Sequence, residues 1–473
     1  MDLMFYDLAL LVLFIIFSSF FLYRNKKNLK QEGWLLLYKT KWGVRLIDKI
    51  GIKYKRTLKF LSYVSIFLGY ILMVAIVYLI IQTIYLYFTT EIARVISAPP
   101  IAPLIPYFPQ LFGLESFFPP FYFIYFIVAI LIIATVHEFS HGIFARRYDI
   151  KIKSTGFAFL KWFPAIFGAF VEQDDKDMDK KTKFEQMSVL SAGVFANVVI
   201  AVLFFVILCL FFSYAFTPTG IVFDGFIYDS IGIATITSMN GISLDNPNFE
   251  RILELSDSDK LNKIEADGEK YVITSEILEQ QKNSEEVLLY YDSPAINANL
   301  NAVITEINGV EVLSLEKFSE EIGKYSPGEK IMISTLGMEG EIEQEIVLGE
   351  NPGNSGEAWV GIGFAQKVKK GVVGKIYNYF TYKEEHVYYK PNFGEASIFI
   401  KDLLWWIFFL NVLVALMNML PLGILDGGRF FYLTVLGITK SDNFAKKTFA
   451  FITWFLLFSL LAVMIKWAWV RFF

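Results

Sequence analysis

Six long apolar segments constrain the fold of this 473-residue chain more than any other feature. They begin near Leu3, Phe60, Phe121, Val189, Ile398 and Phe449. A helix that crosses a bilayer needs about 20 mostly apolar residues, and each segment is long enough. Charged residues make up only 19% of the chain, which is too few to cover the surface of a soluble protein of this length. The sequence therefore predicts a polytopic α-helical membrane protein with about six transmembrane helices.

Charge and cysteine content exclude several classes of function. The formal net charge of −4 gives no excess of basic residues, so no nucleic-acid partner is expected. The single cysteine, Cys209, lies inside an apolar segment. A disulfide framework, a cysteine-ligated zinc site and an iron–sulfur cluster are therefore excluded.

The distribution of basic residues predicts the orientation in the membrane. In the loop Arg24–Lys59, lysine and arginine far outnumber the acidic residues, Glu32 and Asp48. Cytoplasmic loops carry such an excess, so we expect this loop inside and the N-terminus outside. The first apolar segment lacks the basic start and cleavage site of a signal peptide, and we interpret it as a retained signal anchor. The chain is expected to be an integral, multi-pass protein of the cell membrane.

A polar region from 217 to 366 differs from the rest of the chain. Apolar and polar residues alternate there, as in EKIMISTLG and EIEQEIVLG, which predicts strands. A helix capped by Ser314 is expected just before them. The turn EINGVEV, this helix and the PGEK hairpin together resemble a PDZ domain, so we expect an inserted PDZ-like α+β domain. Alternating topology predicts that this domain is extracytoplasmic.

The number of PDZ-like units stays open at this stage. The sequence from Ile227 weakly repeats the sequence from Tyr290, which favours two units. One unit with an insertion across Asp245–Glu286 is the alternative. PDZ domains bind extended peptide at a sheet edge, so a peptide or protein segment is an expected partner.

The stretch HEFSH, at the end of the third apolar segment, has the pattern of a zinc-binding helix. His137 and His141 are four residues apart and share one helix face, so they can supply two of four tetrahedral ligands. Glu138 can reach a zinc-bound water and take its proton during attack on a carbonyl. Ionisable groups are costly inside a bilayer, which favours a functional site over a histidine pair without function.

A catalytic zinc needs a third protein ligand. Asp426 lies in an otherwise apolar run between Leu425 and Gly427, and the topology brings it to the same level as the two histidines. A simple helix cap is the alternative for Asp426. The remaining histidine, His386, is expected on the opposite side of the membrane as a solvated surface residue.

These motifs resemble those of the site-2 protease family of intramembrane zinc metalloproteases. HEFSH on one segment and NMLPLGILDGGR on a later one carry the resemblance. SAGVFAN matches a G-x-x-x-N element of the family, and PAIFGAFVEQDD matches a membrane-re-entrant β-hairpin that follows the zinc-binding helix. The PDZ-like insertion between the core segments is similar to one that many members of the family carry, and LLLYKTKWG is similar to archaeal members. The family often has a proline where this chain has Ile424, so the backbone leading into the aspartate motif is expected to differ.

The resemblance implies one Zn²⁺ ion per chain, held by three side chains: His137, His141 and Asp426. It implies Glu138 as the catalytic base. It also implies that two asparagines position the substrate or stabilise the transition state: Asn197 and Asn418.

By the same resemblance, the expected function is hydrolysis of peptide bonds within or near transmembrane segments of membrane proteins, as in regulated intramembrane proteolysis. The expected partners are such substrates and the lipid bilayer. A hairpin at Gly156–Val171 would offer a strand edge to an extended substrate, although a plain cytoplasmic loop is the alternative. Topology predicts an active site in the cytoplasmic half of the membrane. A metal or ion transporter and a non-catalytic peptide-binding membrane chaperone are the alternative functions.

Four domains are expected. They are the N-terminal pair of transmembrane helices with a basic inner loop and an outer loop (1–120), the catalytic membrane core (121–216), the PDZ-like domain (217–366), and the C-terminal core helices with the aspartate motif (367–473).

Overall fold

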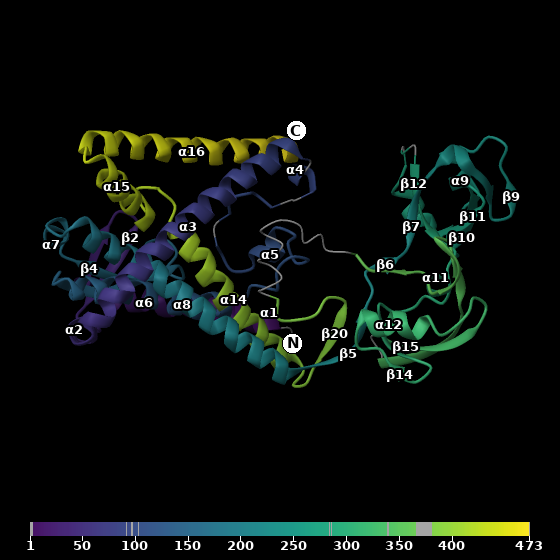
Figure 1. Ribbon diagram of the computed structural model, residues 1–473, viewed down its shortest axis with the longest axis horizontal. Helices are drawn as coiled ribbons and strands as arrows, with labels where there is room; N and C mark the ends of the chain where they lie inside the picture. Colours follow the sequence, from purple (N-terminus) through teal and green to yellow (C-terminus); the bar gives the residue numbers. More distant parts are fainter. Residues whose placement is uncertain are drawn as a thin grey trace. The chain divides into compact units, whose positions relative to one another are not determined.

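The chain divides into two compact units (Figure 1). The computed structural model describes residues 3–90, 92–95, 98–102, 104–282, 284, 286–337, 340–365 and 381–472. We call Met1–Phe211 together with Ile398–Phe473 the membrane unit, and Phe212–Ser397 the β-rich unit. The expected PDZ-like domain falls within the β-rich unit, and its expected end at 366 lies outside the described residues.

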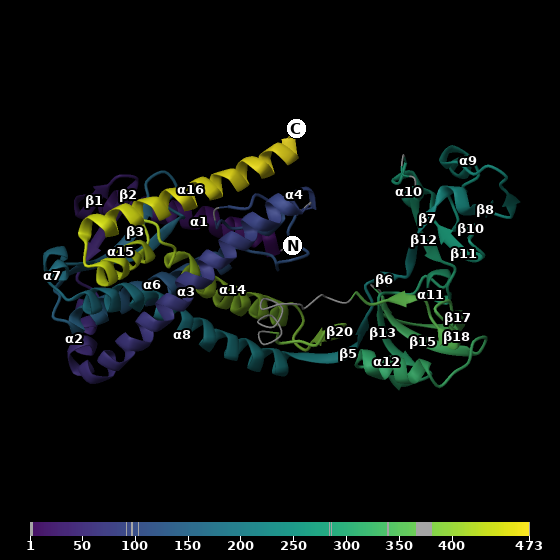
Figure 2. The same cartoon turned by 45° about the horizontal axis from the view of Figure 1, so that its top comes forward.

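Within the described residues, six helices are long and apolar enough to cross a membrane, which confirms the polytopic architecture. They are α1 (Leu3–Arg24), α3 (Lys55–Thr89), α6 (Phe123–Arg147), α8 (Lys183–Ala215), α14 (Glu395–Asn418) and α16 (Asp442–Phe472). Several of these helices begin a few residues before the apolar segment, because the polar residues that precede the segment are also helical. In the membrane unit, α8 and α14 lie side by side (Figures 1 and 2), and the ring centroids of Phe205 and Phe408 are 5.1 Å apart.

Shorter helices connect these spans in the membrane unit. They are α2 (Val44–Lys53), α4 (Ile92–Val95), α5 (Phe108–Leu111), α7 (Asp175–Asp179) and α15 (Asp426–Thr439). The last of these begins at the aspartate of the DGGR motif.

A four-stranded antiparallel sheet also belongs to the membrane unit. Its order is β1 (Leu29–Glu32), β2 (Leu35–Thr40), β3 (Ile152–Leu160), β4 (Phe167–Gln173). The predicted hairpin is therefore confirmed as β3 and β4, but the loop after α1 contributes a second hairpin that was not predicted. Aromatic residues of α1 pack on the sheet, with Phe14 5.6 Å from Phe167 and Phe21 5.0 Å from Tyr38 between ring centroids.

A buried carboxylate joins α1 to the helix that carries HEFSH. Asp7 is 4% exposed and accepts the backbone N–H groups of Phe123 and Ile124 at 2.6 and 2.9 Å. The hydroxyl of Tyr107 donates to the same carboxylate at 2.5 Å. Because the first N–H groups of a helix have no partner within it, Asp7 caps α6 from another helix.

The β-rich unit contains two main sheets, each over its own apolar core. The first has the order β7 (Tyr228–Gly232), β12 (Glu286–Tyr291), β11 (Glu269–Ile273), β10 (Asn262–Ala266), β8 (Ile236–Met239), β9 (Ile242–Ser243). The second has the order β16 (Gly340–Val347), β15 (Lys330–Gly337), β13 (Val303–Ile307), β5 (Phe216–Val222), β20 (Val387–Pro391), with β14 (Val310–Glu311) beside β13. The described part of the unit also has two strand pairs: β17 (Gly349–Asn351) with β18 (Asn354–Trp359), and β19 (Ile362–Gly363) with β6 (Gly225–Phe226).

Short helices alternate with these strands. They are α9 (Phe249–Glu254), α10 (Ser275–Glu279), α11 (Pro294–Asn297) and α12 (Leu315–Ile322). The predicted cap of α12 is confirmed, because the hydroxyl of Ser314 accepts the N–H of Lys317 at 3.1 Å.

The same local structure occurs twice in the β-rich unit. The order strand, Asn–Gly turn, short strand, helix and β-hairpin describes β8 to β11 and again β13 to β16. In the first copy the side-chain oxygen of Asn240 accepts the N–H of Lys263 at 2.9 Å. In the second, Asn308 accepts the N–H of Met332 at 2.8 Å. Both asparagines have positive φ angles, 50° and 48°, which asparagine tolerates better than most residues.

Candidate metal centre and active-site cleft

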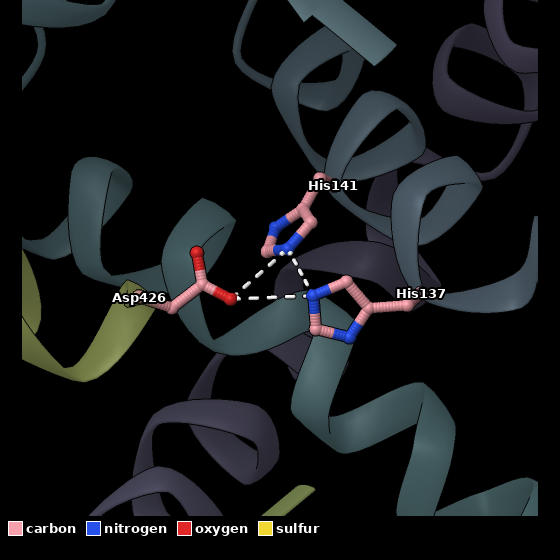
Figure 3. A group of neighbouring side chains, drawn as sticks. All are labelled: His137, His141 and Asp426. Atoms are coloured by element: carbon pink, nitrogen blue, oxygen red, sulfur yellow. Dashed lines mark hydrogen bonds and ion pairs between the residues drawn. The ribbon is translucent and has the colours of Figure 1, made fainter. Parts of the chain in front are cut away.

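The structure brings together His137, His141 and Asp426 (Figure 3). The Nε2 atoms of the two histidines are 3.0 Å apart, and each is 3.3 Å from Oδ2 of Asp426. Ligands held about 2.0–2.2 Å from a tetrahedral zinc ion are separated by about 3.3 Å. This donor set and its spacing therefore fit a zinc ion with one coordination position left over.

The local sequence explains how each ligand reaches this place. His137 and His141 lie one turn apart on α6, and both are 7% exposed. Asp426 begins α15 after a turn that packs tightly against the end of α14. A Cβ atom on Gly427 would lie 2.3 Å from the backbone carbon of Met419, so only glycine fits there. Ile424, the departure from the family pattern, is 92% exposed and does not displace the aspartate from the ligand group.

Helix α8 supports both histidine rings from behind. The carbonyl oxygen of Val189 lies 2.7 Å from Nδ1 of His141, and the amide of Asn197 lies 3.1 Å from Nδ1 of His137. Between them, a Cβ atom on Gly193 would lie 2.5 Å from Nε2 of His141. The absence of a side chain at Gly193 therefore lets α8 approach the ligands closely.

Glu138 and Asn418 lie on the wall of a cleft of about 660 Å³ that contains the three ligands. One carboxylate oxygen of Glu138, Oε2, accepts the backbone N–H of Val171 at 3.0 Å. This bond ties Glu138 to β4 and leaves its other oxygen, Oε1, for a proton. Phe167 and Gly168 of β4 also line the cleft, so the sheet and the ligands share one wall.

The structure places Asn197 and His386 differently from what the sequence suggested. Asn197 is completely buried against His137 and does not line the cleft. The expectation that His386 is a solvated surface residue is wrong. Its side chain is 11% exposed because it packs between Asp224, 3.3 Å from Nδ1, and the ring of Phe364, with centroids 5.2 Å apart. His386 belongs to the β-rich unit and lies outside the ligand group.

Several groups around the cleft were not predicted. Arg429 lines it and donates to Asp179 at 2.7 Å and to Gln186 at 2.9 Å, which ties α15 to α7 and α8. Lys39 of β2 pairs at 2.8 Å with Glu172, another lining residue. The DGGR sequence could have indicated Arg429, whereas the carbonyl of Val189 has no signal in the sequence.

Comparison with known proteins agrees with this geometry. The sequence model of peptidase family M50 matches residues 125–461 of the chain. The chain is also 32% identical, over 197 residues, to an uncharacterized protein of Methanocaldococcus jannaschii. That similarity covers 40% of this chain and 48% of the relative, so the chain spans about half the length of the curated relative it matches. The family match covers both ligand segments, and the chain belongs to peptidase family M50, the site-2 protease family.

Proposed function

We propose that this protein is an intramembrane zinc metalloprotease that hydrolyses peptide bonds within or near transmembrane segments of membrane proteins. The observation that carries the proposal is the convergence of His137, His141, Asp426 and Glu138 on one cleft with β4 along its wall. A transporter would need the ligands but neither the glutamate next to them nor a strand edge. A peptide-binding chaperone would need none of the four side chains.

The chemistry assigns one role to each group. A zinc ion bound by the two histidines and the aspartate would supply a Lewis acid for the scissile carbonyl and for the attacking water. Glu138 takes a proton from the attacking water at Oε1 and passes it to the leaving amine. Its bond from Val171 holds the carboxylate in place during both transfers. Asn418, on the cleft wall, donates a hydrogen bond from its amide to a substrate carbonyl.

Substrate binding uses the outer edge of β4. A transmembrane helix must unwind before a protease can reach its backbone, because its carbonyls are hydrogen-bonded within the helix. The N–H of Val171 points away from β3 toward Glu138, and alternate residues of a strand direct their backbone groups to the same side. The backbone groups of Ala169 and Phe167 therefore face the cleft and can pair with an extended substrate.

Helix geometry and charge support a location in the cytoplasmic half of the membrane. His137 lies about 21 Å along α6 from its first residue, Phe123, at 1.5 Å per residue, in a hydrocarbon core about 30 Å thick. The metal site is then nearer the end of α6 that carries Arg146 and Arg147. Positive charge favours a cytoplasmic position for that end, and the N-terminus and the β-rich unit would then be outside.

The β-rich unit would select substrates through two PDZ-like modules. The repeated strand, turn, helix and hairpin favour two modules over one module with an insertion. A groove of about 440 Å³ lies between α12 of the second copy and residues 356–362, which follow that copy in the chain, and Phe318 and Val360 are among its lining residues. An extended peptide or protein segment is the partner that such an apolar groove beside a helix accepts.

The experiment that tests this function replaces the base. Glu138→Gln in purified, membrane-reconstituted protein should lower the rate of substrate cleavage by several orders of magnitude. Zinc content should stay at the wild-type value because Glu138 is not among the ligands. Asp175→Asn is the matched control, since Asp175 is another carboxylate that lines the cleft. Cleavage by Glu138→Gln at the rate of Asp175→Asn would contradict the proposed function.

A further inference from the structure

Each imidazole of the metal centre can bind metal through Nε2 only when Nδ1 carries the ring proton. A neutral imidazole has one N–H and one lone pair, and the group hydrogen-bonded to the first nitrogen fixes which is which. For His141 that group is the carbonyl oxygen of Val189, 2.7 Å from Nδ1. A carbonyl can only accept a hydrogen bond, so Nδ1 of His141 donates and Nε2 keeps its lone pair.

His137 has a side chain in the equivalent place. Nδ1 of His137 lies 3.1 Å from Nδ2 of the Asn197 amide, and Asn197 is 0% exposed. An asparagine amide can donate through its nitrogen or, after a half-turn of the group, accept through its oxygen. Oδ1 of Asn197 is buried and has no other hydrogen-bond partner among the described residues. A half-turn of the amide exchanges its nitrogen and oxygen, and it would place this unpartnered oxygen next to Nδ1 of His137.

We propose that Asn197 is a positioning residue for the metal: its Oδ1 accepts the Nδ1–H of His137 and so holds Nε2 of that ring as a ligand. This inference rests on the proposed metal site and refines the expectation that Asn197 positions the substrate or stabilises the transition state. Asn197 is fully buried and absent from the lining of the cleft, so it acts through His137 instead.

The spacing along α8 supports this role. Val189, Gly193 and Asn197 follow one another at intervals of four residues and therefore lie on one face of the helix. On this face Val189 contacts His141, Gly193 leaves space for both rings because it has no side chain, and Asn197 contacts His137. A Cβ atom on Gly193 would lie 2.6 Å from Cε1 of His137 and 2.5 Å from Nε2 of His141, so the gap is needed for both contacts. Within GVFAN, Gly193 thus allows the close approach of α8 and Asn197 supplies the group at His137.

The test uses two substitutions that separate acceptor from donor. Asn197→Leu keeps a similar volume in a buried helix but removes both groups. Asn197→Asp keeps an oxygen acceptor and removes the donor. Asn411→Leu is the matched control, because Asn411 is also fully buried in a long helix, with an Oδ1 atom that has no partner among the described residues.

Two measurements on full-length protein in detergent read out the site without using proteolysis. The zinc dissociation constant is obtained by competition with a chelator, and the visible absorption bands of the Co²⁺-substituted protein report ligand geometry. We expect Asn197→Leu to raise the dissociation constant by about 10- to 100-fold, as is typical when the partner of a metal-binding histidine is lost. We expect shifted Co²⁺ bands in the same variant. Asn197→Asp and Asn411→Leu should stay within about threefold of wild type, with unshifted bands, because each keeps an acceptor at His137.

Two results would overturn the inference. One is a zinc dissociation constant and Co²⁺ spectrum of Asn197→Leu equal to those of wild type. The other is an affinity of Asn197→Asp as weak as that of Asn197→Leu, which would mean that the amide donates rather than accepts. Failure of the proteolytic function looks different: wild type would bind zinc normally and leave every membrane substrate intact.

Discussion

Polar groups converge on one site in the membrane unit, whereas in the β-rich unit the same polar contact is repeated in two separate places. In the membrane unit, α6, α8 and α15 all direct a group toward one metal centre, and each group contacts at least one other. In the β-rich unit, Asn240 and Asn308 make the same contact in two places, each with a hairpin of its own copy. We therefore expect a change in the membrane unit to spread through the whole site. A change in the β-rich unit should stay within one copy.

The largest effect on zinc affinity should come from replacing Asp426, the one proposed ligand that does not lie on α6. Asp426→Asn replaces a carboxylate by a neutral amide, which is a poor zinc ligand, and leaves two histidines. We expect zinc affinity to fall by more than about 100-fold, beyond the loss typical of a group that only supports a ligand. Metal analysis after dialysis measures the result.

His386→Ala is the control for Asp426→Asn, because His386 is paired with Asp224 in the β-rich unit. Its zinc content should equal that of wild type. The reverse pattern, with zinc lost only in His386→Ala, would show that the metal centre is built from other residues.

A smaller effect should follow from filling the gap on α8. Gly193→Ala adds a methyl group whose carbon would lie 2.5 Å from Nε2 of His141, so the ring or the helix must move. We expect about a tenfold or larger loss of zinc affinity, similar to losing a group that orients a ligand. Helix propensity alone would favour alanine over glycine by about 1 kcal/mol, so a loss cannot come from a weaker helix.

Gly437→Ala on α15 is the control for this substitution. A Cβ atom there meets nothing within 4 Å, so only helix propensity changes. If Gly193→Ala binds zinc as tightly as Gly437→Ala, the close approach of α8 has no role in metal binding.

Local patterns in the sequence predicted much of this arrangement. Apolar length gave the six spans, and the spacing of His137 and His141 indicated one helix face. Asp426 could be assigned only from the topology and the family resemblance, because it lies 285 positions after His141 and no local pattern joins the two. The hairpin of β1 and β2 was missed because its strands are short, lie in a basic loop and gain their stability from pairing with the distant β3. The role of Asn197 depends on how α8 is rotated against α6, which a sequence cannot show.

The smallest expected effect separates the two copies in the β-rich unit. Asn308→Ala removes the oxygen that accepts the N–H of Met332, and it places alanine at a positive φ angle. The free energy needed to open this copy should fall by about 1 kcal/mol, which corresponds to roughly fivefold faster amide hydrogen exchange in β13 and β15. Asn240→Ala should speed exchange in β8 and β10 only, and by more, because Nδ2 of Asn240 also donates to Leu255 and Asn262. Asn308→Asp keeps an acceptor oxygen and should exchange like wild type. If either alanine variant speeds exchange equally in both copies, the two form a single cooperative module, and the contrast with the membrane unit disappears.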